Sequence, residues 1–148
     1  GQHIVCALYH GPDADYAKGE ELAKDMYGND IAPILGSHRI TVEQMAILEP
    51  ALVETFSAAL ISAIREAYEK VVNEMGVPKE AAWEFLMGHL RTELAILFDF
   101  AGFPFSDGAK LAVEKAQTRI FKDNWKEEIF NISAIQRSVK EITDSLEG

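Results

Sequence analysis

The chain has 148 residues, of which 48% are hydrophobic, and its formal net charge is −10. This apolar content is enough for one folded domain and argues against disorder. The negative charge, with no basic stripe, excludes nucleic acid as an expected partner and favours small molecules, metals or other proteins. Cys6 is the only cysteine, so an internal disulfide is impossible and a cytoplasmic location is expected.

The first 40 residues are typical of a β-α-β piece. An apolar run at residues 3–9 predicts a buried strand. A helix is expected over residues 16–27, and residues 31–35 predict a second short strand. Two strands alone would leave most of a sheet unpaired, so we expect them to complete a sheet supplied by further chain. The sequence is then expected to be the tail of something longer.

Residues 41–75 predict the long central helix of a helical domain. Thr41 opens a capping box, and the apolar residues that follow point in nearly every direction, so burial on most sides is expected. Glu49, Pro50 and Glu54 interrupt this apolar stretch, which makes a membrane-spanning helix improbable. Pro50 should distort the helix. Buried acids need a partner, a proton or a cation, so the two carboxylates indicate a site.

The remaining sequence predicts three further helices, at residues 78–100, 106–121 and 133–146, with a short helical turn or loop at 123–132. The helix at 78–100 is expected to pack against the central helix, because both are too apolar to stand alone. We therefore predict a mainly α-helical bundle domain over residues 41–148. Its large apolar surface also predicts self-association, most simply as a homodimer.

His89 and Glu93 are the strongest candidates for chemistry. Residues four apart share one face of a helix, so the pair can offer two ligands to one cation. A salt bridge or a satisfied core histidine would use the same spacing and is the commoner reason for it. Gly88 favours the functional interpretation. A glycine inside a helix costs about 1 kcal/mol, and close approach of another group to the backbone would explain its presence.

Five further residues are candidates for the same site. Glu43 lies at the start of the central helix, where an acid complements the helix dipole without any other role. Glu54 falls within about 20° of the same face if every residue advances by about 100°. His38 and Arg39 are expected where a strand ends, a common ligand position in open α/β sheets, although a surface ion pair would also account for Arg39. Arg39 and Glu49 are assigned to substrate binding.

The segments HRITVEQMAILEPALVET and GVPKEAAWEFLMGHLRTELAI resemble the C-terminal domain of phosphogluconate-dehydrogenase-like, NAD-binding oxidoreductases. This family includes semialdehyde-dehydrogenase-type and D-apionate oxidoisomerase-like proteins, and the resemblance covers essentially the whole chain. It implies that residues 1–40 end a Rossmann-type dinucleotide-binding domain and that residues 41–148 form a substrate and dimerisation domain. NAD or NADP would be bound mainly by a preceding domain, because the chain has no dinucleotide fingerprint. The fragment alone is then expected to be inactive.

A second likeness is to ketol-acid reductoisomerase, in which acidic residues from two helices hold divalent metal beside the nicotinamide. Glu43 and Glu93 match acidic ligand positions, and His89 stands where that enzyme has an acid. The resemblance implies a divalent metal, with Mg²⁺, Mn²⁺ and Ca²⁺ all open, because a histidine ligand changes the metal preference.

Together these observations predict an NAD(P)-dependent oxidoreductase or oxidoisomerase that acts on a small polar hydroxy or oxo acid. Glu43, His89 and Glu93 would hold the metal, and His38 or Glu54 would orient the substrate or move a proton. Neither nucleic acid nor a membrane is an expected partner. The alternative is a non-catalytic helical dimerisation module whose acids form pairs between helices.

Overall fold

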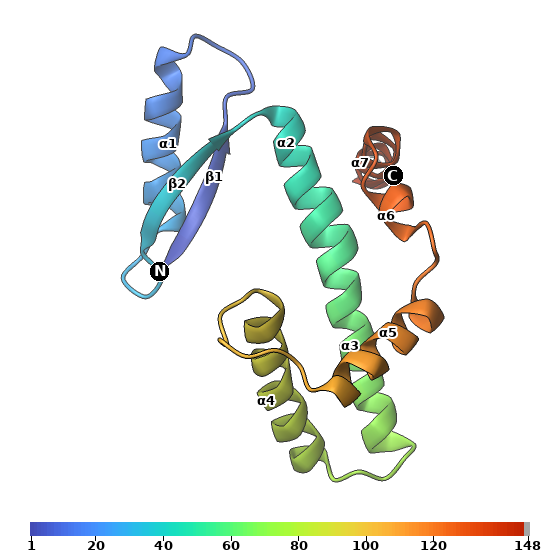
Figure 1. Cartoon of the computed structure of the whole chain (residues 1–148). Coiled ribbons are helices and arrows are strands. Elements are labelled where there is room, and N and C mark those ends of the chain that lie inside the picture. The colour runs from blue at the N-terminus through green and yellow to red at the C-terminus, as the bar shows by residue number, and fades with distance from the viewer. Residues whose placement is uncertain (147–148) are drawn as a thin grey trace. The chain divides into compact units, whose positions relative to one another are not determined.

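The protein is mainly α-helical with two short strands, as predicted. The computed structural model describes residues 1–146. In chain order the elements are β1 (Gln2–Ala7), α1 (Ala14–Tyr27), β2 (Ile34–Ile40), α2 (Val42–Ala46), the π-helix η1 (Ile47–Ser57), α3 (Ala58–Asn73), α4 (Lys79–Leu97), α5 (Asp107–Ile120), α6 (Trp125–Ile129) and α7 (Ile132–Leu146), as Figure 1 shows.

Two compact units make up the chain. Unit 1 comprises Gly1–Phe56 together with the residues from Ile129 onward, and unit 2 is Ser57–Glu128. These units are spatial clusters, and each is described here by itself. The predicted boundary after residue 40 concerns the domains of a longer protein, so it stays a prediction.

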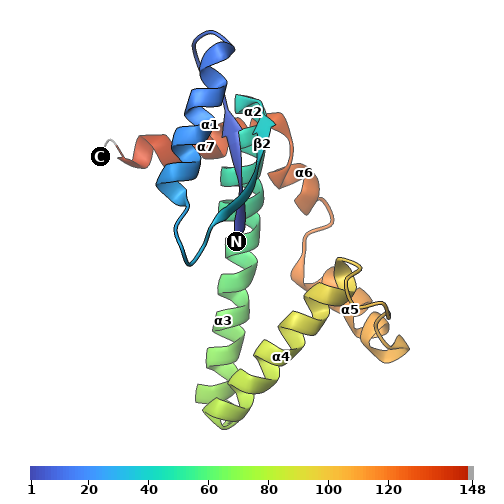
Figure 2. The same ribbon diagram turned by 90° about the vertical axis from the view of Figure 1, so that its left-hand side faces the viewer.

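The predicted β-α-β piece is present in unit 1. β1 and β2 pair in parallel, with Val5 opposite His38 and Cys6 opposite Arg39. Parallel strands need a crossover connection, and α1 supplies it, lying along the two strands in both views (Figures 1 and 2). His38 and Arg39 therefore lie within the second strand.

The second strand begins later than the prediction of residues 31–35, which is wrong in position. Asn29 Oδ1 accepts hydrogen bonds from the backbone N–H of Ile31 at 3.0 Å and of Ala32 at 2.8 Å. An asparagine that binds the backbone two and three residues on forms a turn. The chain can extend only after this turn, so β2 runs over Ile34–Ile40.

The central helix begins at the predicted residue and continues without a break from Val42 to Asn73. Thr41 Oγ1 accepts from the Gln44 N–H at 3.2 Å, and Gln44 Oε1 accepts from the Thr41 N–H at 2.9 Å, which confirms the capping box. The expected distortion at Pro50 takes the form of the π-helix η1, a helix type defined by hydrogen bonds between residues five apart.

The burial predicted for this helix is wrong for the described chain. Ala51 is its only buried residue, whereas Leu52 is 42% and Ile61 is 62% exposed. Glu49 and Glu54 are exposed as well. Too few elements lie beside the helix to cover all its sides, since a helix that is apolar all round needs neighbours all round. The uncovered apolar surface is of the kind that binds another protein surface.

The same helix is long and apolar enough, by length and composition alone, to cross a membrane. Core helices of water-soluble proteins pass this test too. The two carboxylates and the proline in the middle of the stretch argue against a span. The expectation that no membrane is a partner stays a prediction.

Unit 2 contains the predicted packing of α3 against α4. The rings of Tyr68 and Trp83 meet edge to face, with centroids 5.9 Å apart and planes at 73°. The two helices also lie side by side where α4 turns back from the end of α3 (Figures 1 and 2). Further along, Ser106 caps α5 as expected, because its Oγ accepts from the Ala109 N–H at 3.3 Å.

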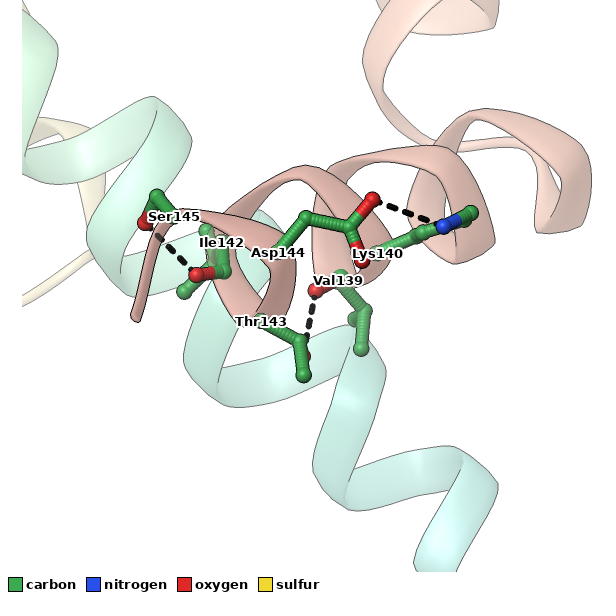
Figure 3. A network of polar contacts seen from close by, with 6 residues as sticks. All are labelled: Val139, Lys140, Ile142, Thr143, Asp144 and Ser145. Atoms are coloured by element: carbon green, nitrogen blue, oxygen red, sulfur yellow. Dashed lines mark hydrogen bonds and ion pairs between the residues drawn. The ribbon is translucent and has the colours of Figure 1, made fainter. Parts of the chain in front are cut away.

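The last helix, α7, belongs to unit 1 and has one apolar side. Ile135 on that side is buried, and just before the helix the ring of Phe130 meets Phe56 of η1 edge to face at 5.6 Å. The polar side chains bond within the helix, as Figure 3 shows: Lys140 Nζ to Asp144 Oδ2 at 2.7 Å, Thr143 Oγ1 to the Val139 carbonyl at 2.9 Å, and Ser145 Oγ to the Ile142 carbonyl at 2.7 Å.

Arg39 joins β2 to the start of α1. Its guanidinium donates to the carboxylate of Asp13 and lies 4.3 Å from the centroid of the Tyr16 ring. Asp13 immediately precedes α1, but its side chain makes no cap hydrogen bond and pairs with Arg39 instead. The hydrogen bond from Arg39, followed by the positive charge of Arg39, lowers the pKa of Asp13.

Asp13→Asn is expected to lower stability at neutral pH and to flatten its decline in acid. The pKa of Asp13 is lower in the folded chain than in the unfolded chain, where it is about 3.9. The pair therefore stabilises the fold above about pH 4 and loses this contribution as the pH falls through the folded-state pKa. Urea unfolding of both proteins from about pH 7 down to about pH 2 measures this.

The matched control for this comparison is Asp15→Asn. Asp15 pairs only locally, with Lys18 at 3.2 Å and three residues away, so its removal should change the pH dependence little. Parallel loss of stability in wild type and Asp13→Asn across the acid range would contradict a role for the Asp13–Arg39 pair.

Candidate functional site

His89 on α4 is held in one orientation by its own helix. Its Nδ1 lies 2.8 Å from the carbonyl oxygen of Phe85. A carbonyl only accepts, so Nδ1 carries the hydrogen and, in the neutral ring, Nε2 keeps its lone pair. The imidazole also packs on the Phe85 ring, with centroids 4.1 Å apart. A histidine that donates one ring N–H to a backbone carbonyl and points the other nitrogen outward has the orientation of a metal ligand or a base.

Glu93 lies one turn after His89 and is half-buried, whereas His89 is exposed. No ion pair between them is among the described contacts, so the salt-bridge explanation of their spacing gains no support. A Cβ placed on the neighbouring Gly88 would meet no atom within 4 Å. The described chain therefore leaves open space beside the backbone there, as a site for an approaching group requires.

Glu43 presents an ionised carboxylate at the start of α2. Its own backbone N–H, and secondarily the side chain of Thr41, form hydrogen bonds to the carboxylate and lower the pKa of Glu43. The first turn of a helix favours negative charge for the same reason. The side chain is exposed, so Glu43 could bind a cation, although its role in the helix start would account for it alone.

Glu49 and Glu54 both lie in the π-helix and are exposed. The prediction that Glu54 shares a face with Glu43 assumed about 100° per residue throughout the helix. A π-helix turns less per residue because each turn holds more residues. That geometric argument therefore does not apply across Ile47–Ser57, and the roles of both acids stay predictions.

Arg39 and His38 both have partners in unit 1. Arg39 is engaged by Asp13 and Tyr16, so a substrate carboxylate would have to compete with Asp13 for the guanidinium. The Nε2 of His38 lies 3.2 Å from the Nδ1 of His3 on the neighbouring strand. His3 was not among the residues predicted from the sequence. Side chains alternate between the two faces of a strand, so His3 and His38 can be placed on one face only when position 38 is known to lie in β2. The predicted strand at residues 31–35 did not include that position.

The predicted metal ligands fall in different units, Glu43 in unit 1 and His89 with Glu93 in unit 2. Their convergence stays a prediction. Within either unit, the described residues 1–146 contain no group of three or more His, Cys, Asp or Glu side chains that could hold a metal ion.

The chain thus has a parallel β-α-β piece that leads through a capping box into a long helix, and a later helix that carries a histidine and an acid one turn apart. The chain belongs to the phosphogluconate dehydrogenase (decarboxylating) C-terminal family, whose model matches residues 1–143. This match confirms the resemblance found in the sequence.

Two curated relatives carry the same name. The chain is 43% identical over 142 residues to D-apionate oxidoisomerase from Rhizobium rhizogenes. The aligned residues cover 96% of this chain and 50% of the relative. It is 42% identical over 142 residues to D-apionate oxidoisomerase from Cupriavidus necator, covering 96% and 49%. The chain thus spans about half the length of the curated relatives it matches.

A solved structure has a similar fold over nearly the whole chain. It is a semialdehyde dehydrogenase NAD-binding protein from Cupriavidus necator, in complex with calcium and NAD. The TM-score is 0.85 at 41% identity, and the match covers 93% of this chain and 48% of that one. About half of that protein therefore has the fold described above.

Gly88→Ala is expected to raise the free energy of unfolding of this chain by about 0.5–1 kcal/mol, because alanine is the better helix former and the added methyl meets open space. Urea unfolding measures the change. Gly19→Ala in α1 is the matched control, since a Cβ there also meets nothing within 4 Å. Destabilisation by Gly88→Ala together with stabilisation by Gly19→Ala would show that another group lies against Gly88 and leaves no room for the added methyl.

Proposed function

We propose that this chain is the C-terminal substrate-binding and dimerisation part of an NAD(P)-dependent oxidoreductase or oxidoisomerase that acts on a small polar hydroxy or oxo acid. Family membership supports the oxidoreductase class. The name shared by the two curated relatives supports an acid substrate. The NAD in the similar structure supports the cofactor, which a preceding domain would bind for the most part.

The observation that carries the proposal is the orientation of His89. Its Nδ1 donates a hydrogen bond to the Phe85 carbonyl, so Nε2 is the nitrogen that can coordinate an ion or accept a proton. The imidazole is held in place by its contact with the Phe85 ring. A ligand that is oriented before binding loses little side-chain entropy when it binds. Glu93, one turn on, adds a carboxylate on the same side of the helix.

A divalent metal fits the chemistry of the proposed donors Glu43, His89 and Glu93. Carboxylate oxygens suit Mg²⁺, Ca²⁺ and Mn²⁺, and an imidazole nitrogen shifts the preference toward Mn²⁺. The calcium in the similar structure supports a hard cation. When bound, the metal would polarise the oxygens of the substrate's hydroxyl and carbonyl groups.

The chain's other candidates would act on the substrate directly. His38 or Glu54 would orient it or take a proton from its hydroxyl group. Arg39 would hold its carboxylate by two parallel hydrogen bonds once Asp13 is displaced. Glu49 would accept a hydrogen bond from a substrate hydroxyl.

The protein would work as a homodimer in the cytoplasm. Uncovered apolar side chains on α4 support the dimer: Leu94 is 56% and Leu97 is 64% exposed. The same exposure favours the second candidate function, a non-catalytic dimerisation module. The two candidates differ in whether His89 and Glu93 bind a cation.

Metal binding is tested by thermal unfolding of the nucleotide-bound parent protein with and without Mg²⁺, Mn²⁺ or Ca²⁺. A metal that binds only the folded state should raise the melting temperature, by the equivalent of about 2.7 kcal/mol at a hundredfold excess over Kd. His89→Gln should remove most of this rise while keeping a polar side chain on Phe85. A wild-type melting temperature indifferent to all three metals would leave Glu43, His89 and Glu93 as ordinary pairs between helices.

The matched control is His10→Gln, which changes an exposed histidine in the turn after β1. It should keep the full response to metal. Loss of the response in both variants would indicate a general effect of removing histidine rather than a site on α4.

Self-association is tested separately by light scattering at tens of micromolar, roughly the range in which weak dimers form. Leu97→Glu is expected to shift the protein toward monomer, because it places a charge in the proposed apolar contact. Thr92→Glu adds the same charge at another exposed position of α4 and should change the mass little. A monomeric wild-type chain at these concentrations would overturn the dimer proposal.

A further inference from the structure

Two histidines meet across the two strands of unit 1. β1 and β2 run side by side (Figure 2), with His3 opposite Gly36 and Val5 opposite His38. Residues two apart in a strand point to the same face. His3 and His38 therefore project from the same face of the sheet, and pairing of the strand backbones sets the spacing between them.

The ring geometry matches two ligands of one metal ion. His3 Nδ1 and His38 Nε2 are 3.2 Å apart, the ring centroids are 5.3 Å apart, and the ring planes differ by 17°. Two nitrogens at this separation, each about 2.0–2.1 Å from a common ion, subtend an angle of about 100–106° at the ion, close to the tetrahedral value of about 109°. A hydrogen bond aims the two nitrogens at each other, so each ring would turn by roughly 40° to direct its lone pair toward that point.

Gly36 is what makes room for this arrangement. A Cβ at Gly36 would lie 2.8 Å from both Nδ1 and Cε1 of the His3 ring. Real Cβ atoms do not approach this closely, so any other residue at position 36 would force the ring to move. The position of His3 beside His38 therefore depends on a specific glycine.

The surroundings leave the site open to an ion. The other residues on this face of the two strands are apolar or glycine: Val5, Ala7, Gly36 and Ile40. The nearest charged residue of the strands, Arg39, lies on the opposite face and pairs with Asp13. Lys24 of α1 pairs with Glu20 of the same helix. Both histidines are exposed, so water can occupy the remaining coordination positions.

We propose that His3 and His38 form a two-histidine site for a borderline transition-metal ion of the Zn²⁺ type. Imidazole nitrogens suit such ions, whereas the hard cations of the proposed function prefer oxygen. In the absence of the ion, one ring donates a hydrogen bond to the other. On binding, the donating ring moves that proton to its other nitrogen, so both rings coordinate while neutral and no other bond changes. The ion would occupy the nitrogen of His38 that points to His3.

The test is calorimetric titration of this chain with Zn²⁺ near neutral pH, with additional residues placed ahead of Gly1. The extension removes a terminal amine that could chelate the ion together with His3. His3→Gln and His38→Gln should each lower the affinity for Zn²⁺ on the order of tenfold or more, the size of effect typical of changes around a metal. Gly36→Ala should lower it as well, although it removes no ligand.

Controls separate this site from the proposed site on α4. His10→Gln should bind Zn²⁺ as the wild type does. His89→Gln should keep the part of the Zn²⁺ binding that is lost in His3→Gln and His38→Gln, and circular dichroism should show that every variant keeps its helices. Zn²⁺ affinity that is unchanged in both His3→Gln and His38→Gln would overturn the proposal. So would a loss confined to His89→Gln, which would place the ion on α4. If His38 holds the ion, Glu54 is left to orient the substrate or take its proton in the proposed function, and the rest of that proposal depends on neither outcome.

Discussion

The junction at Thr41 is the constraint on which the rest of the structure depends. β2 ends at Ile40 and the long helix begins at Val42, so one residue changes the chain from extended to helical. Thr41 and Gln44 close a reciprocal pair of hydrogen bonds there, which satisfies N–H groups that a helix start would otherwise leave open. The position of Glu43 in the first turn, and the low pKa of its carboxyl group, follow from this junction.

Local signals predicted most of the fold because each depends on a few neighbouring residues. The capping box, the serine cap of α5 and the glycine that ends α1 all act within one turn of chain. The start of β2 was missed because the Asn29 turn competes with strand formation. Burial of the central helix was overestimated. The pattern of apolar residues shows which sides of a helix favour burial, but it does not show whether elements of the same chain pack against those sides.

The candidate site was predictable only where its geometry is helical and regular. His89 and Glu93 were found by their spacing, and the structure adds what the sequence could not show, the bond from His89 to the Phe85 carbonyl. Whether Glu43 and Glu54 share a face could not be derived from the sequence. The eleven-residue π-helix between them changes the rotation per residue, and no simple sequence rule predicts such a helix. The His3–His38 pair depends on strand register, which is a relation between distant residues.

The scarcity of buried side chains has a thermodynamic consequence. Ala51 and Ile135 are the only buried hydrophobic residues of the described chain, so little of its free energy of folding comes from an interior of its own. In the proposed dimer, surfaces shared between the subunits would supply the remainder, and folding would be linked to assembly by mass action. Amide hydrogen exchange along the long helix would consequently slow as the protein concentration rises, because opening would require the shared surfaces to separate first.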